Sequence, residues 1–211
     1  MTEHRWTDLT TESELRALLG EPSARAADKD RDRLHQLDRE WLAASPFCLV
    51  ATSGADGTCD VSPKGDPPGF AKALDATTVV IPERAGNRRA DGYRNVLTNP
   101  HVGLIFMVPG RGDTLRINGR ARLVSDAPFF DDLVVQGHRP VLALVITVEQ
   151  VFHHCAKAFL RSRLWDPQSW GGDALASRAV LARSLDRPDE SLAELERYYG
   201  ADYANGLYPQ S

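Results

Sequence analysis

TLRINGRARLVS, residues 114–125, shows the clearest alternation of apolar and polar side chains in this chain. The apolar positions are Leu115, Ile117, Ala121 and Leu123, and the polar positions between them are Arg116, Asn118, Arg120 and Arg122. Successive side chains of a β-strand point to opposite faces, so this pattern predicts a half-buried strand. One face meets a core, and the other meets water or something polar.

Other short β-rich runs lie on both sides of this strand. They are PFCLVATSG (46–54), TCDVS (58–62), TTVVIP (77–82), HVGLIFMV (101–108) and VLALVITVEQVF (141–152). Asp56-Gly57 between the first two is a signal for a two-residue hairpin turn. The sequence therefore predicts about six strands, hairpin links and a small barrel, because barrel closure hides strand edges.

Loops and short helices are predicted between these strands. SPKGDPPGFAKALD (62–75) is too rich in proline and glycine for a helix or a central strand. A helix is expected from about Asn87 to Thr98, ended by Asn99-Pro100, and APFFDDLVVQG (127–137) is expected to form a short helix. These elements interrupt the sheet without changing the predicted fold class, mainly β with helical extensions (α+β).

Helical patterns occupy both ends of the chain. Leucines recur at helical intervals between residues 11 and 44, and AKAFLRSRLW, DALASRAVLARSL and DESLAELERYYG follow Cys155. Asp189 and Ser191 are candidate caps for the last of these helices. We predict an N-terminal helical arm at 1–44, a β-domain at 45–154 and a C-terminal helical extension at 155–211.

Composition excludes several classes of protein. The formal charge of −4 and an apolar content of 42% argue against a disordered chain and a general nucleic-acid binder. No run approaches the roughly 20 apolar residues of a membrane span, and the first residues show no apolar leader, so we expect a cytoplasmic protein that binds no membrane. Three cysteines without CxxC spacing predict reduced thiols. We expect no metal site at His153-His154-Cys155, since adjacent strand residues point apart.

Two basic turns are candidates for an anion site. Ser62-Pro63-Lys64-Gly65 follows a predicted strand, and Gly86-Asn87-Arg88-Arg89 opens a predicted helix. A helix start offers free N–H groups, and arginine can bind two phosphate oxygens at once. Cations in a first helical turn oppose the helix dipole by roughly 0.3–1 kcal/mol, which favours a bound anion there. The alternative is that these arginines are solvated surface charges.

In their order, four stretches resemble the pyridoxamine 5'-phosphate oxidase-like, FMN-binding split-barrel flavoproteins. They are FCLVATSGADGTCDVSPKGDPPGF, GNRRADGYRNVLTNPHVGLIF, TLRINGRARL and HHCAKAFLRSRLW. The resemblance covers residues 45–165 and is closest to a bacterial branch marked by SPKGDPPGF and GNRR. It implies a homodimer of six-stranded split barrels with FMN at the subunit interface, and C-terminal helices that pack on the barrel and that interface.

The resemblance also implies roles for individual residues. Ser62, Lys64, Asn87, Arg88 and Arg89 would bind the phosphate and ribityl chain. Val61 with Ser62, and Ile81 with Pro82, would line one face of the flavin. Polar contacts would come from Arg116, Asn118 and Arg120, and the partner chain would supply Lys157, Arg161 and Ser162.

The function implied is an FMN-dependent oxidoreductase that acts on an unknown small substrate, with reduced nicotinamide or deazaflavin as a possible electron donor. The chain lacks an Arg-x-His type signature near its C-terminus, so the resemblance carries over the flavin site and not the vitamin substrate. No catalytic residue is assigned; His101 and His138 are either proton donors or structural. The alternatives are a non-catalytic flavin-binding or regulatory module, a related protein that uses haem or deazaflavin, and a small nucleic-acid-binding barrel. The absence of an aromatic residue from TLRINGRARL and the negative net charge argue against the last.

Overall fold

The computed structural model describes residues 6–208, which form two compact units divided between Asp30 and Arg31. The first unit contains the helices α1 (Glu12–Leu19) and α2 (Ala24–Ala27). α1 begins with a capping box in which the Thr11 side chain accepts from the Glu14 N–H and the Glu14 carboxylate accepts from the Thr11 N–H. Neither helix buries a residue.

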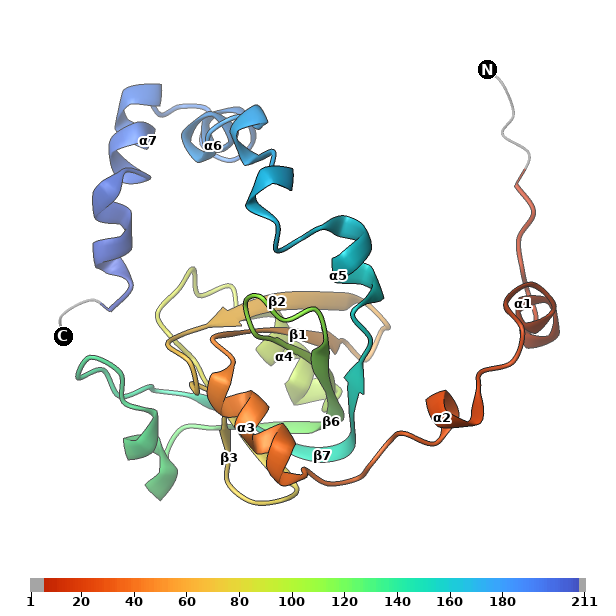
Figure 1. Ribbon diagram of the computed structural model, residues 1–211. Coiled ribbons are helices and arrows are strands. Elements are labelled where there is room, and N and C mark those ends of the chain that lie inside the picture. Colours follow the sequence, from red (N-terminus) through yellow and green to blue (C-terminus); the bar gives the residue numbers. More distant parts are fainter. Residues whose placement is uncertain (1–5, 209–211) are drawn as a thin grey trace. The chain divides into compact units, whose positions relative to one another are not determined.

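The second unit is built on an antiparallel sheet of seven strands, in the order β2-β1-β5-β6-β7-β4-β3 (Figure 1). The strands are β1 (Phe47–Ser53), β2 (Cys59–Gly65), β3 (Lys72–Ala73), β4 (Thr78–Pro82), β5 (His101–Met107), β6 (Thr114–Val124) and β7 (Ala143–His154). The fold is therefore mixed α/β, and the expected number of six strands is wrong. The seventh strand is the two-residue β3, which lies inside the stretch expected to be a loop.

Alternation along the strands positions the core. Leu115, Ile117 and Ala121 of β6 are buried, as the sequence pattern predicts, and they pack with Leu104 and Phe106 of β5. A second cluster lies around Val80 and Val145 and is covered by the 3₁₀ helix η1 (Pro128–Leu133). This helix is the short helix expected after Asp126.

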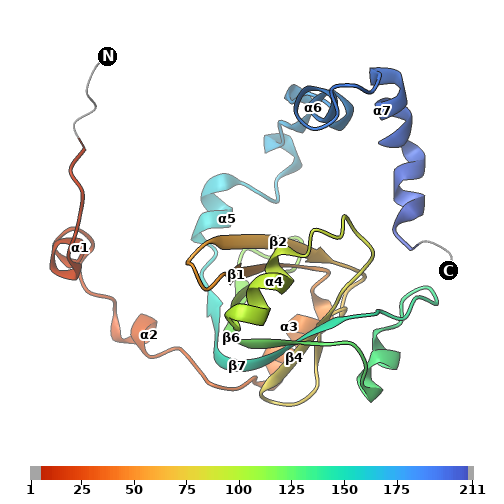
Figure 2. The same cartoon turned by 180° about the vertical axis from the view of Figure 1, so that it is seen from behind.

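The helices α3 (Gln36–Ala44) and α4 (Asp91–Thr98) pack against the sheet. α3 buries Trp41 and Leu42 in the main core. α4 lies beside β1 and β2, as Figure 2 shows from behind. Its amphipathic face buries Val96 against the same core. α4 therefore brings its first turn next to the edge strand β2.

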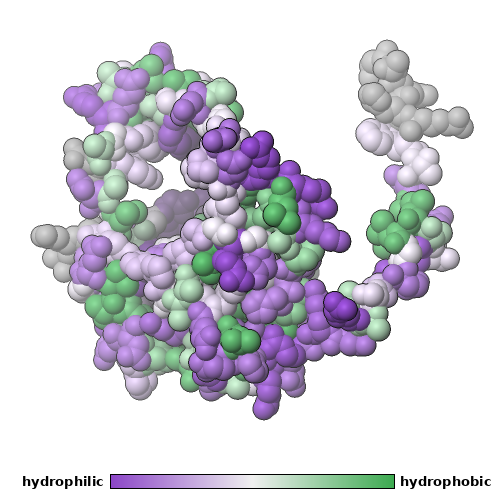
Figure 3. Space-filling view, in the orientation of Figure 1, coloured by the Kyte–Doolittle hydropathy of each residue, from purple (hydrophilic) through white to green (hydrophobic). Residues whose placement is uncertain are grey.

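The C-terminal part forms α5 (Lys157–Ser162), α6 (Arg178–Leu185) and α7 (Leu192–Tyr198), with 3₁₀ turns η2 (Pro167–Ser169), η3 (Gly172–Ala174) and η4 (Ala201–Gly206). α6 and α7 share a small cluster of Ala179, Ala182 and Leu195. The Ser191 side chain caps α7 by accepting from the Glu194 N–H. Figure 3 shows a recess between these helices and the sheet. Whether the chain divides into functional segments at residues 44 and 154 stays a prediction.

Three local expectations are corrected. Ser62–Gly65 continues β2 as an edge strand, where proline is tolerated, and is no loop. The hairpin turn spans Gly54–Gly57, closed by the Gly57 N–H on the Gly54 carbonyl at 3.1 Å, and is longer than two residues. α4 begins at Asp91 and not at Asn87. Among the described residues, no helix is long and apolar enough to cross a membrane.

Candidate functional site

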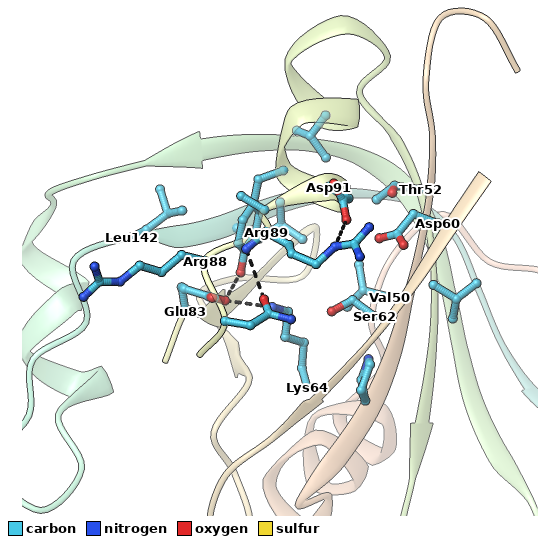
Figure 4. Close-up of a pocket in the computed structure, with 18 of the residues that line it drawn as sticks. Val50, Thr52, Asp60, Ser62, Lys64, Glu83, Arg88, Arg89, Asp91 and Leu142 are labelled. Carbon is cyan, nitrogen blue, oxygen red and sulfur yellow. Dashed lines mark hydrogen bonds and ion pairs between the residues drawn. The ribbon is translucent and has the colours of Figure 1, made fainter. Parts of the chain in front are cut away.

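A cavity of about 490 Å³ lies between β2, the loop after β4 and the first turn of α4. Of the residues singled out in the sequence, it is lined by Val61, Ser62, Lys64, Asn87, Arg88 and Arg89. The two basic turns are 21 or more residues apart in the chain, and the fold brings them to one cavity. The sequence analysis expected both turns to contribute to one anion site, and residues of both turns line this cavity (Figure 4).

The register of β2 explains which of its side chains enter the cavity. Lys64 pairs with Cys48, and Ser62 pairs with Val50. Paired residues of an antiparallel sheet place their side chains on the same face, and Cys48 and Val50 point into the core. Lys64 and Ser62 therefore face inward, as does Asp60, which lies opposite Thr52.

Glu83 joins the first basic turn to α4 through hydrogen bonds. Its Oε2 lies 2.7 Å from Lys64 Nζ and also accepts from the Tyr93 hydroxyl. Lys64 Nζ lies 4.8 Å from the centre of the Tyr93 ring, within reach of a cation–π contact. Burial and the hydrogen bond to Glu83 raise the pKa of Tyr93, so its phenol remains a proton-bearing donor at neutral pH.

The loop before α4 has an uncommon backbone. Arg88 has φ 59° and Ala90, the residue before the helix, has φ 57°, both in the left-handed region that L side chains seldom adopt. The Asn87 side chain accepts from the Arg89 N–H at 3.1 Å. Such strained positions cluster at binding sites, because surrounding structure must hold them.

The two arginines of this loop point in opposite directions (Figure 4). Arg89 Nε lies 2.7 Å from Asp91 Oδ2, whereas Arg88 has no ion pair or side-chain hydrogen bond with another residue that the structure describes. Both precede the helix, and Asp91 occupies its first turn. The argument that these arginines oppose the helix dipole is therefore wrong. The unpaired guanidinium of Arg88 is the cation that remains available to a ligand.

The lining of the cavity combines charged and apolar side chains. Its charged residues are Lys64, Arg88, Arg89, Asp60, Glu83 and Asp91. Its apolar residues include Val50, Val96, Val141, Leu142 and Leu144. Two of its cations are paired, Lys64 with Glu83 and Arg89 with Asp91. This arrangement suits a ligand that has an apolar body and an anionic group near Arg88.

The sequence analysis missed the titratable cavity residues Asp60, Glu83, Asp91 and Tyr93. Asp60 could have been found by continuing the strand pattern of TCDVS through Lys64, since residues two apart share a face. Glu83 lies just beyond the apolar run TTVVIP, and its partners Lys64 and Tyr93 lie 19 and 10 residues away in the chain. No local pattern signals such contacts.

Ile81 and Pro82 lie at the end of β4, outside the main cavity. Ile81 is buried in the core, and Pro82 lines an adjoining cavity of about 320 Å³ together with Ser62, Lys64 and Asn87. The structure therefore brings Pro82 near the other candidates, whereas Ile81 packs in the core.

The second expected group does not line this cavity. Arg116 lies 5.0 Å from the centre of the Phe152 ring, and Asn118 Nδ2 donates to Gln150 Oε1 at 2.5 Å. Lys157, Arg161 and Ser162 belong to α5 and are exposed. These residues contribute to the site only if another copy of the chain brings them there.

The two histidines considered as proton donors have identifiable surroundings. His101 Nε2 accepts from Arg120 Nη1 at 3.1 Å, because a guanidinium only donates, which leaves Nδ1 to donate to Asn99 Oδ1 at 2.9 Å. This histidine is a structural link between β5 and β6. The His138 ring faces Tyr208, with ring centres 5.7 Å apart.

Comparisons with known proteins place the chain in a family. A sequence model described as pyridoxamine 5'-phosphate oxidase matches residues 34–155, more than half of the chain. No curated protein sequence matches.

Solved structures resemble the chain at low identity. A candidate pyridoxamine 5'-phosphate oxidase from Lactobacillus delbrueckii is 21% identical, with a TM-score of 0.46 over 58% of this chain and 95% of that one. An FMN-binding protein from Syntrophomonas wolfei is 10% identical (TM-score 0.42, 56% and 89% covered). HutZ, the haem storage protein from Vibrio cholerae, is 15% identical (TM-score 0.41, 57% and 94% covered). Because these scores are low, the assignment to a family rests on the sequence model.

Proposed function

Since the chain belongs to the pyridoxamine 5'-phosphate oxidase family, we propose that it is an FMN-dependent oxidoreductase that acts on a small molecule. The cavity between β2 and α4 is the proposed FMN site. The single observation that carries this proposal is the position of the unpaired Arg88 in a cavity that is also lined by apolar side chains.

The size and lining of the cavity fit a flavin nucleotide. Its volume of about 490 Å³ lies within the range of roughly 300–1,000 Å³ that is usual for cofactor sites. The apolar side chains of Val50, Leu142 and Leu144 suit contact with an aromatic ring, and the basic turns suit a phosphate. The residues present therefore fit the group that the family implies.

Arg88 is the residue that we assign to the phosphate, with support from the first N–H groups of α4. Ala90 provides no side-chain cap, so these N–H groups lack that usual acceptor. Asn87 and Ser62 line the same cavity and can donate to the ribityl chain or the phosphate. Lys64 and Arg89 neutralise Glu83 and Asp91, which lowers the repulsion between the carboxylates and an incoming anion.

Bound FMN would supply the two-electron chemistry, because its ring accepts and donates a hydride. Lys64 and Tyr93 both donate to Glu83 Oε2, which keeps the carboxylate in one position beside the cavity. Val141 and Leu142 provide apolar contacts at the edge of the cavity. Reduced nicotinamide or a deazaflavin is the proposed electron donor.

A homodimer completes this proposal. Arg116, Asn118, Lys157, Arg161 and Ser162 do not line the cavity of their own chain. We assign them to the cavity of a second copy, where cations on the exposed face of α5 would meet the same ligand.

The first test is the absorption spectrum of the purified protein, followed by titration with FMN. We expect a flavin spectrum, or saturable uptake of about one FMN per chain, and steady oxidation of a reduced donor. Uptake without turnover would make the protein a non-catalytic flavin-binding module. A Soret band, or exclusive use of deazaflavin, would assign the cavity to a different cofactor, and absence of any uptake would reject the proposal.

The phosphate assignment is tested by Arg88→Glu. Loss of charge-assisted hydrogen bonds of roughly 1.5–3 kcal/mol should raise the FMN dissociation constant about tenfold or more. The matched control is Arg94→Glu, an exposed residue of α4 outside the cavity, which should change affinity little. Equal effects of the two substitutions would contradict a direct contact from Arg88.

A further inference from the structure

The C-terminal segment of the chain contacts two loops close to the proposed FMN site. The Tyr208 hydroxyl donates to the carboxylate of Asp66, which lies 142 residues earlier in the sequence. The ring of Tyr208 faces that of His138. The end of the described chain therefore lies beside the loop of residues 134–140 (Figure 1).

Asp66 is a buried charge with a complete set of partners. Its side chain is 1% exposed, and it accepts from Arg84 Nε as well as from Tyr208. Arg84, 16% exposed, also donates through Nη2 to the Leu133 carbonyl at 2.7 Å and through Nη1 to the His138 carbonyl at 3.4 Å. A buried carboxylate requires hydrogen-bond donors, so removing the Tyr208 hydroxyl would weaken the ion pair between Asp66 and Arg84.

Arg84 starts the loop that carries the phosphate candidates. The last ladder hydrogen bond after β4 runs from the Glu83 N–H to the Leu142 carbonyl at 2.8 Å. Beyond it, the loop passes through Asn87 and Arg88 to the left-handed Ala90. The side chain of Arg84 therefore fixes the loop where it leaves the sheet, and Tyr208 helps to fix Arg84 through Asp66.

The same segment forms a wall next to the proposed site. Leu207 and Tyr208 line a cavity of about 320 Å³ that shares Glu83, Arg88 and Val141 with the proposed FMN cavity. The C-terminal segment thus lines the same cavity as Arg88. A residue in this position can influence ligand binding without touching the ligand.

We propose that Tyr208 is a positioning residue that holds the loop of residues 84–90 in its ligand-binding form, through Asp66 and Arg84. This inference rests on the proposed function for the identity of the ligand. Left-handed non-glycine residues persist only where the surrounding structure holds them, and apparent affinity falls in proportion to the fraction of chains in the binding-competent conformation. Tyr208 raises that fraction.

The test compares Tyr208→Phe with Tyr203→Phe in the full chain. Tyr203 lies in the same segment but is exposed, and among the described aromatic rings it contacts only those of Tyr198 and Tyr199. Hydrogen–deuterium exchange is measured on peptides covering residues 83–93, without added FMN. We expect Tyr208→Phe to speed exchange in the loop several-fold, to leave β5 and β6 unchanged and to raise the FMN dissociation constant about tenfold. Tyr203→Phe should match the unmodified protein.

Each outcome is decisive. Unchanged exchange in residues 84–90 would overturn the proposal, even if FMN affinity fell, because Tyr208 would then act by direct contact. Equal acceleration throughout the sheet would assign Tyr208 a merely structural role and overturn it as well. If the unmodified protein takes up no FMN, the proposed function fails, whereas the exchange experiment still decides whether Tyr208 holds the loop.

Discussion

Asp38 is a single residue outside the site that makes the stability of the fold depend on pH. Its buried carboxylate lies 2.5 Å from Arg31 Nη1 and 3.1 Å from His153 Nε2, and it accepts the His35 N–H at 2.7 Å. Burial raises the pKa of Asp38, but these hydrogen bonds and charges outweigh burial and lower it overall. The folded state therefore favours the ionised form.

The pH dependence of stability follows from that shift. A carboxyl whose pKa is lowered on folding adds stability that is present above the unfolded pKa, near 3.8, and is lost as pH falls through the lower folded value. Asp38→Asn should reduce the free energy of unfolding by about 2 kcal/mol at pH 7 and flatten its dependence on pH below about 4. Denaturant titrations at several pH values measure both effects.

The exposed neighbour Asp32 provides the control for this prediction. Its carboxylate is 84% exposed and 3.8 Å from Arg33, a geometry that contributes little to stability. Asp32→Asn should leave the pH profile unchanged. A profile for Asp38→Asn that parallels the unmodified protein would contradict the account of Asp38.

Residue types in the sequence identified part of the site. Arg88, Arg89 and Lys64 were found because cations next to glycine turns are typical of anion sites. Glu83 and Tyr93 were not found, since their roles arise from contacts that only the folded sheet creates. Basic residues of the cavity lining could thus be singled out from the sequence, whereas residues whose place depends on a distant partner could not.

At the scale of elements, the joint between β6 and β7 is tightly constrained at one point. The register shifts between Asn118 and Gly119, a bulge in the longest strand pair. A Cβ at Gly119 would lie 2.0 Å from the Thr147 carbonyl oxygen, a backbone atom that cannot rotate away. Only glycine allows this close approach.

Gly119→Ala should therefore destabilise the sheet strongly. We expect a loss of about 3 kcal/mol or more in the free energy of unfolding, because the backbone of β7 must move to relieve the overlap. Gly172→Ala, in an open turn with no atom within 4 Å, should have little effect. Chemical denaturation compares the two variants, and similar stabilities would show that the bulge tolerates a side chain.

Element types were more predictable than element ends. Alternation identified β6 because one face of that strand is buried and the other is not. β2 was cut short because Pro63 and Gly65 argue against a strand, although at a sheet edge both are accepted. The start of α4 was placed four residues early. The break before the helix lies at Arg88 and Ala90, which are left-handed although neither is a glycine, the residue that usually signals such a backbone.

At the scale of the whole molecule, the proposed partner chain accounts for the residues left outside the cavity. Sedimentation of the purified protein should give a mass about twice the 23.2 kDa of the chain. Arg161→Glu, on exposed α5, should then raise the FMN dissociation constant about tenfold by removing a charge supplied across the interface.

Arg183→Glu on α6 is the matched control, an exposed arginine that should not affect binding. A monomer that binds one FMN per chain would contradict the shared site, as would equal effects of the two substitutions. Strand periodicity carries no information about assembly. The expectation of a dimer therefore came from the family resemblance and not from the sequence pattern.

Pro63 on the outer strand has a consequence for how the protein behaves at high concentration. A proline lacks the N–H that a ladder requires, and within a paired strand its nitrogen must face away from the neighbour, here β1. A strand of another molecule that approached the open side of β2 would meet no N–H donor at Pro63, the residue paired with Leu49. This edge is thereby protected against runaway cross-molecule pairing and aggregation.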